Sequence, residues 1–530
     1  MNPTISYKDY HDSKIRNRIF LLGIDGADLE IVQALIRKGE LPGFKKILEA
    51  GSAAPLLSPV IANSAPSWAS IFTGKDIAEH GIVYFQNQYE DRVEFFDLFL
   101  DTIDGERLWT GFDLKDMKSC IINVPITFPP EKVNGIMISG RLANEDSVYT
   151  YPPQLTEELR NLGYHPTFDN AKSDEELFSI LEKRIEVAFD FIKNYPWNMF
   201  FQGFLIIDWI MHHFSEDSLL KQVNEKSDLS DFPIVKRAYK RLDLFIQELT
   251  EKYISPEEDK LFVFSDHGFK RYDFMFNVNI WLIKNGFLSL KRPPAMVLRD
   301  IMLYLPIKIK RAVFGQKNVL GIRQPVFDWK KNVDWKKTTV YSPEFFVNCS
   351  SFRINPYLNL DERAKDKIIN DLISKLSQVN LGESPVFCSF HRRDEIFRGP
   401  YSGRMPELLG MLEPNVRNDK RIYGKGEIFT RKNSVEHRRE GIFIAWGKDI
   451  LKTDLDYLPE VKDIFPTVRY AAGLPVHRNI SGKVIEEIFS ESYLKFNQLD
   501  ILDTEFKPNI TVGERYDETL KERLKDLGYL

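Results

Sequence analysis

The feature of this sequence that most constrains its fold is a series of short, continuous apolar runs separated by helical patterns. Parallel strands that are buried on both faces have such runs, without polar alternation. Six runs fit this description: Ile19–Ile24, Cys120–Val124, Ile136–Ser139, Met199–Ile207, Leu261–Ser265 and Gly441–Trp446. They predict the strands of a central, mostly parallel sheet.

Amphipathic segments between these runs predict helices. One covers Asp28–Lys38 and ends at Gly39. A second begins at Ser173, where a Glu three residues on gives the spacing of a capping box, and runs toward Tyr195. A third follows Pro233. Strands that alternate with helices predict an α/β fold with helices on both faces of the sheet.

Composition excludes several classes of protein. The chain has 530 residues, enough for a large core, and a net charge of −5 from 72 basic and 77 acidic residues. This balance gives no overall attraction to nucleic acid, so we expect no nucleic-acid binding. The three cysteines, Cys120, Cys349 and Cys388, form no CxxC pair, which argues against a disulfide framework or a thiolate zinc site.

The expected location is the cytoplasm. The first 18 residues are polar and charged, and no apolar stretch approaches the roughly 18 residues that a membrane span needs. One stretch, 291–323, holds eight Lys or Arg and a single acidic residue among apolar ones. It fits either a basic surface helix of an insertion or a helix in peripheral contact with a membrane.

Acidic and histidine side chains stand where the predicted strands end, the edge at which α/β sheets gather their functional residues. Aspartates follow three of the strands, each near a histidine or a glycine. The six residues are Asp25, Asp208, His212, Asp266, His267 and His437. Carboxylate oxygen and imidazole nitrogen without thiolate suit zinc or manganese. Singly, each has a plainer interpretation, as a helix cap or a buried histidine.

A serine precedes a short predicted helix that has Pro66 near its start and Gly74 at its end. The hydroxyl of Ser64 is therefore expected at a helix N-terminus, where N–H groups favour a phosphate. A nearby cation would make it a nucleophile. The alternative is that Ser64 only caps the helix.

Taken in order, the motifs resemble the type I phosphodiesterase/nucleotide pyrophosphatase family of the alkaline phosphatase superfamily. The matching segments are 22–28, 41–43, 64–74, 80–82, 123–130, Asp208 with His212, 265–269, 436–438, 463–467 and 473–475. The resemblance implies an alkaline-phosphatase-like catalytic domain over 18–500. It also implies an N-terminal extension at 1–17, cap insertions at about 84–194 and 270–337, and a tail at 501–530.

The resemblance also implies two divalent metal ions, zinc first and manganese second. One set of ligands is Asp208, His212 and His437; the other is Asp25, Asp266 and His267, with Ser64 bridging as the nucleophile. Many nucleotide pyrophosphatases have Thr in place of Ser64, and Asn in place of Ser67 to hold a phosphoryl oxygen. The shorter Ser67, a candidate substrate-binding residue, puts that specificity in question. The arginine of sulfatase motifs is absent.

The implied activity is hydrolysis of phosphoesters through a phosphoseryl intermediate on Ser64, with a phosphorylated small molecule or nucleotide as substrate. We expect phosphodiesters to be preferred, because the matched motifs contain no arginine clamp for the extra charge of a monoester. The alternatives are a phosphomonoesterase, a metal-dependent phosphomutase, and a non-catalytic binding protein that retains the fold.

Overall fold

The computed structural model of the protein describes residues 17–143, 145–168, 171–214, 228–291, 332–419 and 427–503. Most of the predicted extension and tail, and residues 292–323 of the basic stretch, lie outside the described residues. Among the described helices, none is long and apolar enough to cross a membrane.

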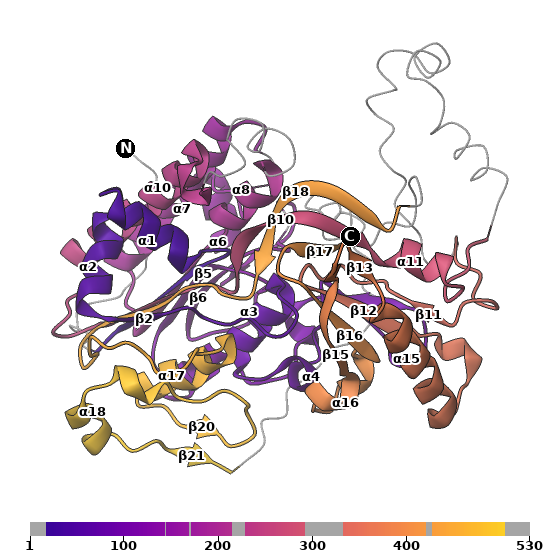
Figure 1. Ribbon diagram of the computed structural model, residues 1–530. Coiled ribbons are helices and arrows are strands. Elements are labelled where there is room, and N and C mark those ends of the chain that lie inside the picture. Colours follow the sequence, from indigo (N-terminus) through magenta and orange to yellow (C-terminus); the bar gives the residue numbers. More distant parts are fainter. Residues whose placement is uncertain are drawn as a thin grey trace.

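An eight-stranded sheet forms the centre of the molecule (Figure 1). Its order is β2 (Ser52–Ala54), β19 (Phe443–Gly447), β9 (Lys260–Phe264), β1 (Ile19–Ile24), β8 (Met199–Phe204), β5 (Ser119–Val124), β6 (Gly135–Ser139) and β7 (Thr150–Tyr151). The five strands from β9 to β6 are parallel, and antiparallel strands flank them. The predicted α/β fold with a mostly parallel sheet is confirmed.

Helices cover both faces of this sheet. Successive side chains of a strand point to opposite faces, so each strand contributes to two cores. In β1, Phe20, Leu22 and Ile24 belong to one core, and Ile19 and Leu21 belong to the other. The first core is closed by α1 (Leu29–Arg37), α2 (Pro42–Ala50), α6 (Leu155–Asn161), α7 (Asp174–Asn194), α8 (Ile206–Phe214) and α10 (Pro233–Lys252). The second is closed by α3 (Ser64–Thr73), α5 (Leu108–Leu114) and α17 (Ile464–Ala471).

The predicted strand Met199–Ile207 is wrong at its carboxyl end. Strand β8 stops at Phe204, and α8 begins at Ile206. The apolar run continues because Ile206 and Ile207 of the helix pack into the same core as the strand. An apolar run alone does not reveal where a strand gives way to a helix. Asp208 therefore lies in the first turn of α8.

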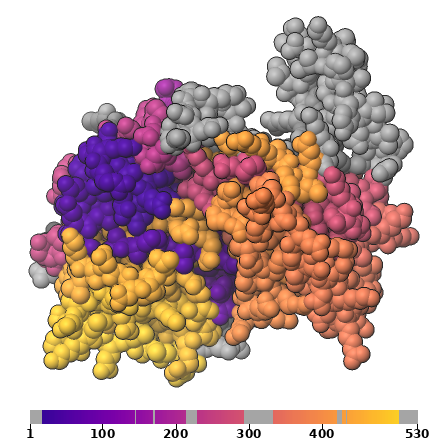
Figure 2. All heavy atoms as spheres, in the orientation of Figure 1, coloured from indigo at the N-terminus to yellow at the C-terminus, as the bar shows by residue number. Residues whose placement is uncertain are grey.

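A second lobe packs beside the sheet and has its own core. It contains the sheet β17 (Val416–Asp419), β10 (Gly268–Asn277), β18 (Phe429–Arg438). It also contains the sheet β11 (Val340–Tyr341), β12 (Cys349–Ile354), β16 (Leu408–Leu412), β15 (Phe387–Arg392), with helices α11 (Val278–Lys284) and α15 (Glu362–Leu376). Figure 2 shows much of this lobe in orange, beside the indigo and yellow ends of the described chain.

The segments expected to be insertions are distributed differently from the prediction. Strands β5, β6 and β7 and helix α7 fall within 84–194, yet they belong to the central sheet and its core. The second lobe includes the described part of 270–337 but continues through β18. Because β18 pairs with β10 along its length, the lobe returns the chain to the carboxyl edge of the sheet.

Candidate active site

Parallel pairing brings three aspartates to one edge of the sheet. Strand β1 lies between β8 and β9, with Ile24 paired to Phe204 and Gly23 paired to Phe264. The chain leaves these strands at the same level, so Asp25, Asp208 and Asp266 meet there. Their relative exposures are 0%, 2% and 0%.

One ligand group joins α8 to the second lobe. His212 lies one helical turn after Asp208, and its Nε2 is 3.1 Å from Asp208 Oδ1. Pairing of Phe269 with His437 between β10 and β18 places His437 Nε2 3.4 Å from the same oxygen. His437 Nδ1 donates to the carbonyl of Ala62 at 3.3 Å, which leaves Nε2 facing the carboxylate. The ligand atoms of the three residues lie within 4.8 Å of one another.

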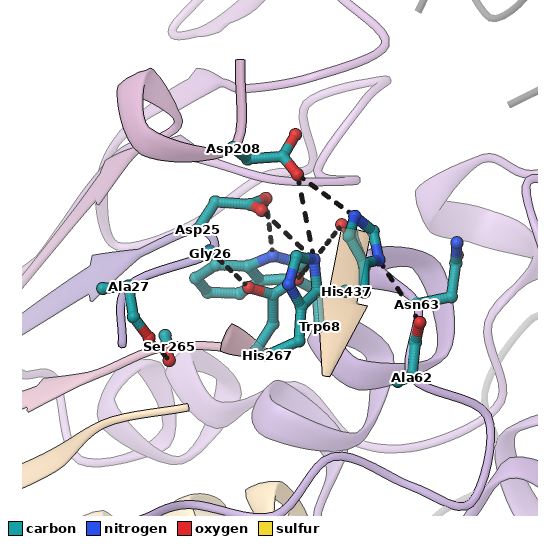
Figure 3. Close-up of polar contacts among 12 residues, drawn as sticks. Asp25, Gly26, Ala27, Ala62, Asn63, Trp68, Asp208, Ser265, His267 and His437 are labelled. Carbon is teal, nitrogen blue, oxygen red and sulfur yellow. Dashed lines mark hydrogen bonds and ion pairs between the residues drawn. The ribbon is translucent and has the colours of Figure 1, made fainter. Parts of the chain in front are cut away.

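A second group adjoins the first (Figure 3). Nε2 of His267 lies 3.7 Å from Asp25 Oδ1, 3.9 Å from Asp208 Oδ1 and 3.3 Å from Asp266 Oδ2. The family resemblance implied that Asp25, Asp266 and His267 form one ligand set. In the structure, Asp25, Asp208 and His267 have ligand atoms within 4.8 Å of one another, so Asp208 is shared by the two groups and Asp266 flanks them.

Each of the three carboxylates is held by a donor on one oxygen. The amide of Gly26 donates to Asp266 Oδ1 at 3.1 Å, and Trp68 Nε1 donates to Asp25 Oδ2 at 3.1 Å. Arg141 Nη1 donates to Asp208 Oδ2 at 3.2 Å. Of the three other oxygens, Asp208 Oδ1 faces His212 and His437, whereas Asp25 Oδ1 and Asp266 Oδ2 are buried and accept no hydrogen bond.

The electrostatics of the cluster fit divalent cations. Burial, followed by the charges of Asp266 and Asp208, raises the pKa of Asp25, and burial with Asp208 raises the pKa of Asp266 to about 7. Burial also acts to raise the pKa of Asp208, but His212 and its other partners hold it well below the usual value. Carboxylates that are buried at this density need compensating positive charge. Oxygen and imidazole donors suit zinc or manganese.

Ser64 is the first residue of α3, and its neighbour Asn63 caps the helix. Asn63 Oδ1 accepts from the amide of Ala65 at 3.1 Å. The Ser64 hydroxyl is fully buried and lies 3.1 Å from His267 Nε2. The alternative that Ser64 serves only as a cap therefore loses its basis, because Asn63 fills that role.

Ser67, the predicted substrate-binding residue, is one turn further along α3. Its side chain is fully buried, and its Oγ has no hydrogen-bond partner. A buried hydroxyl without a partner is uncommon and is consistent with a polar ligand that binds there.

Sequence reasoning missed two residues that contact the cluster, Trp68 and Arg141. Trp68 lies in the same motif as Ser64, but its aromatic side chain indicated only core packing. Arg141 follows β6 after Gly140, so its place at a strand end was a usable signal. Its guanidinium also lies over the Phe85 ring, 5.3 Å from the centroid.

Comparisons with known proteins identify the family and the fold. The family model for type I phosphodiesterase/nucleotide pyrophosphatase matches residues 19–441. No curated protein matches the chain in sequence. The structure resembles human ectonucleotide pyrophosphatase/phosphodiesterase 5, at 13% identity and a TM-score of 0.54, over 89% of this chain and 100% of that one.

Two further solved structures share the fold. The murine counterpart of that protein, an inactive threonine-to-alanine variant in complex with AMP, has 12% identity and a TM-score of 0.53, over 89% of this chain and 100% of that one. Phosphonoacetate hydrolase from Sinorhizobium meliloti, in complex with phosphonoacetate, has 13% identity and a TM-score of 0.55, over 87% and 96%.

Proposed function

This chain belongs to the type I phosphodiesterase/nucleotide pyrophosphatase family and is a phosphoric ester hydrolase; we propose that it cleaves phosphodiesters through a phosphoseryl intermediate on Ser64. The observation that carries the proposal is the position of the Ser64 hydroxyl. It lies 3.1 Å from His267 Nε2, beside the buried carboxylates of the cluster.

The candidate ligands would divide between two divalent ions, for which zinc is the first candidate and manganese the second. Asp208, His212 and His437 would hold one ion, and Asp25, Asp266 and His267 with Ser64 would hold the other. Asp208 also lies within reach of the second position. When bound, such ions lower the pKa of a coordinated hydroxyl or water and neutralise charge on the phosphoryl oxygens.

The proposed reaction has two steps. The Ser64 hydroxyl gives up its proton to solvent as its oxygen forms a bond to phosphorus and the bond from phosphorus to the leaving oxygen breaks. The leaving group takes a proton from solvent. Water then attacks the phosphoseryl group, releases the phosphate product and restores the Ser64 hydroxyl.

The family supports a diester or nucleotide-like substrate, and a relative of the same fold was solved with AMP. One observation favours the second candidate, a phosphomonoesterase. The sequence argument for diesters was the absence of an arginine clamp, and the structure places Arg141 on Asp208. A guanidinium at this position would suit the additional charge of a terminal phosphoryl group.

Two measurements test the proposal. The protein, loaded with zinc or with manganese, is assayed on bis(4-nitrophenyl) phosphate and on 4-nitrophenyl phosphate. Higher kcat/KM on the diester is expected; higher kcat/KM on the monoester would favour the second candidate. Acid quenching during turnover, followed by mass spectrometry, should detect a phosphorylated peptide that contains Ser64. Turnover with no such peptide would refute the covalent route.

A further inference from the structure

Trp68 is a core residue that contacts the candidate metal cluster directly. Its side chain is fully buried, and its one polar atom donates to a carboxylate of the candidate metal cluster, Asp25 Oδ2, at 3.1 Å. Figure 3 shows the indole lying beneath the Asp25 carboxylate. We propose that Trp68 is a positioning residue that fixes Asp25 as a ligand through a single oxygen, Oδ1. This inference rests on the proposed role of Asp25 as a metal ligand.

The surroundings of the indole fix its orientation. Phe201 and Phe264 pack against it, each with ring centroids 6.4 Å away. Gly23 provides the space that the ring occupies, since a Cβ at that position would lie 2.5 Å from Trp68 Cη2. Strand β1 therefore leaves room for the indole two residues before it presents Asp25. Because the ring cannot turn in this space, its N–H points at one place only.

The hydrogen bond leaves the two oxygens of Asp25 with different roles. Oδ2 is occupied by the indole, whereas Oδ1 is buried and accepts no hydrogen bond. A carboxylate free to rotate could present either oxygen or both. With Oδ2 held, Oδ1 is the atom directed toward His267 and Asp208, the other members of its group.

An indole suits this task chemically. It is a donor only, and it carries no charge at any ordinary pH. It therefore orients the carboxylate without competing as a ligand and without cancelling the negative charge that attracts a cation. Partners of this kind around metal sites affect affinity by about 10- to 100-fold when they are removed.

A merely structural role for Trp68 is the competing explanation, and the chain offers a matched control. Trp109 is 1% exposed, belongs to the same core, and also donates its indole N–H to a carboxylate, that of Glu131. Trp68→Phe and Trp109→Phe each remove one buried indole N–H and a similar volume. Only the first is expected to change metal binding.

The experiment measures zinc affinity and stoichiometry of the metal-stripped protein by competition with a chromogenic chelator. We expect Trp68→Phe to weaken one of two ions by about 10- to 100-fold, and Trp109→Phe to leave both within about twofold of wild type. A second variant guards against misfolding: 3-benzothienylalanine at position 68 replaces the N–H with sulfur and keeps the ring shape. It should show the same loss.

Equal affinities for wild type and both position-68 variants would overturn the inference. A comparable loss in Trp109→Phe would also overturn it, because the effect would then be general destabilisation. The failure of the proposed function has a different signature, since the wild-type protein itself would bind no divalent ion.

Discussion

The surroundings of Asp25 and Asp208 differ, although both aspartates emerge at the same edge of the sheet. The Asp25 region includes a second carboxylate, Asp266, and both receive neutral donors, an indole and a backbone amide. Asp208 instead shares an ion pair with Arg141, and its neighbour His212 is 15% exposed. The two regions thus contain similar candidate ligands with different net charge. Because ligand charge tunes the affinity for a cation, the two positions are expected to be unequal.

The largest expected effect concerns Ser64, the proposed nucleophile, which lies beside His267 of the Asp25 group. Ser64→Ala should lower kcat by about a thousandfold or more, because the covalent route is lost, while metal content stays near that of wild type. Ser70→Ala is the matched control, since Ser70 is a buried serine of the same helix that bonds His80. Steady-state kinetics and elemental analysis check both variants. Near-normal turnover by Ser64→Ala would shift the role of nucleophile to water.

The shared position of Asp208 predicts the next effect. Asp208→Asn should weaken both ions, because Asp208 belongs to both ligand groups, whereas Asp25→Asn should weaken one. Asp243→Asn serves as control: Asp243 is a buried carboxylate that accepts the amides of Gly43 and Phe44, away from the cluster. Elemental analysis after dialysis measures the ions retained. Loss of only one ion in Asp208→Asn would show that Asp208 serves one of the two ligand groups and not both.

Arg141 distinguishes the regions by stability. Without metal, Arg141→Met should cost about 3–5 kcal/mol of unfolding free energy, since the buried carboxylate of Asp208 loses its guanidinium partner. The loss should shrink when divalent ions are bound, because they supply positive charge. Arg353→Met, which breaks a buried pair with Glu344, should lose stability to the same extent with or without metal. Denaturant unfolding with and without zinc measures the loss of unfolding free energy in each variant. A metal-independent loss at Arg141 would contradict the comparison.

The last comparison contrasts the cluster histidines with His80, a buried histidine outside the cluster. Its Nδ1 accepts from the amide of Ile82, and its Nε2 meets the Ser70 hydroxyl, so neither nitrogen is directed to a cation. Burial lowers the pKa of His80 to about 3. In the unfolded chain the His80 imidazole therefore binds a proton near pH 6.5, whereas in the native protein it stays neutral at that pH. Stability should fall as pH drops from about 6.5 toward 3, by at most about 1.4 kcal/mol per pH unit. His80→Gln should flatten the slope of unfolding free energy against pH; an unchanged slope would show that other groups titrate.

The sequence predicted the fold where a local pattern carries the information. Strand β1 has the predicted bounds. The polar residues that follow the parallel strands lie together because neighbouring parallel strands, paired in register, end at the same edge of the sheet. The extent of the second lobe could not be predicted, because it depends on the pairing of β10 with β18, which are separated in sequence by the elements from α11 to β17. The donors to the carboxylates could not be predicted either, because they too depend on contacts between segments that are separated in the sequence. Trp68 looks like a core residue until its distance to Asp25 is known.

Assembly of the cluster from distant segments has a consequence for how the protein folds. The contact between Ser64 and His267 spans 203 residues, and that between His212 and His437 spans 225. In the unfolded chain only two pairs of these residues, Asp208 with His212 and Asp266 with His267, are close in sequence, so a cation binds the folded protein far more tightly. Bound metal should therefore raise the melting temperature in proportion to the logarithm of its free concentration. Such long-range contacts form late and slowly, so recovery of metal binding after dilution from denaturant should report completion of folding.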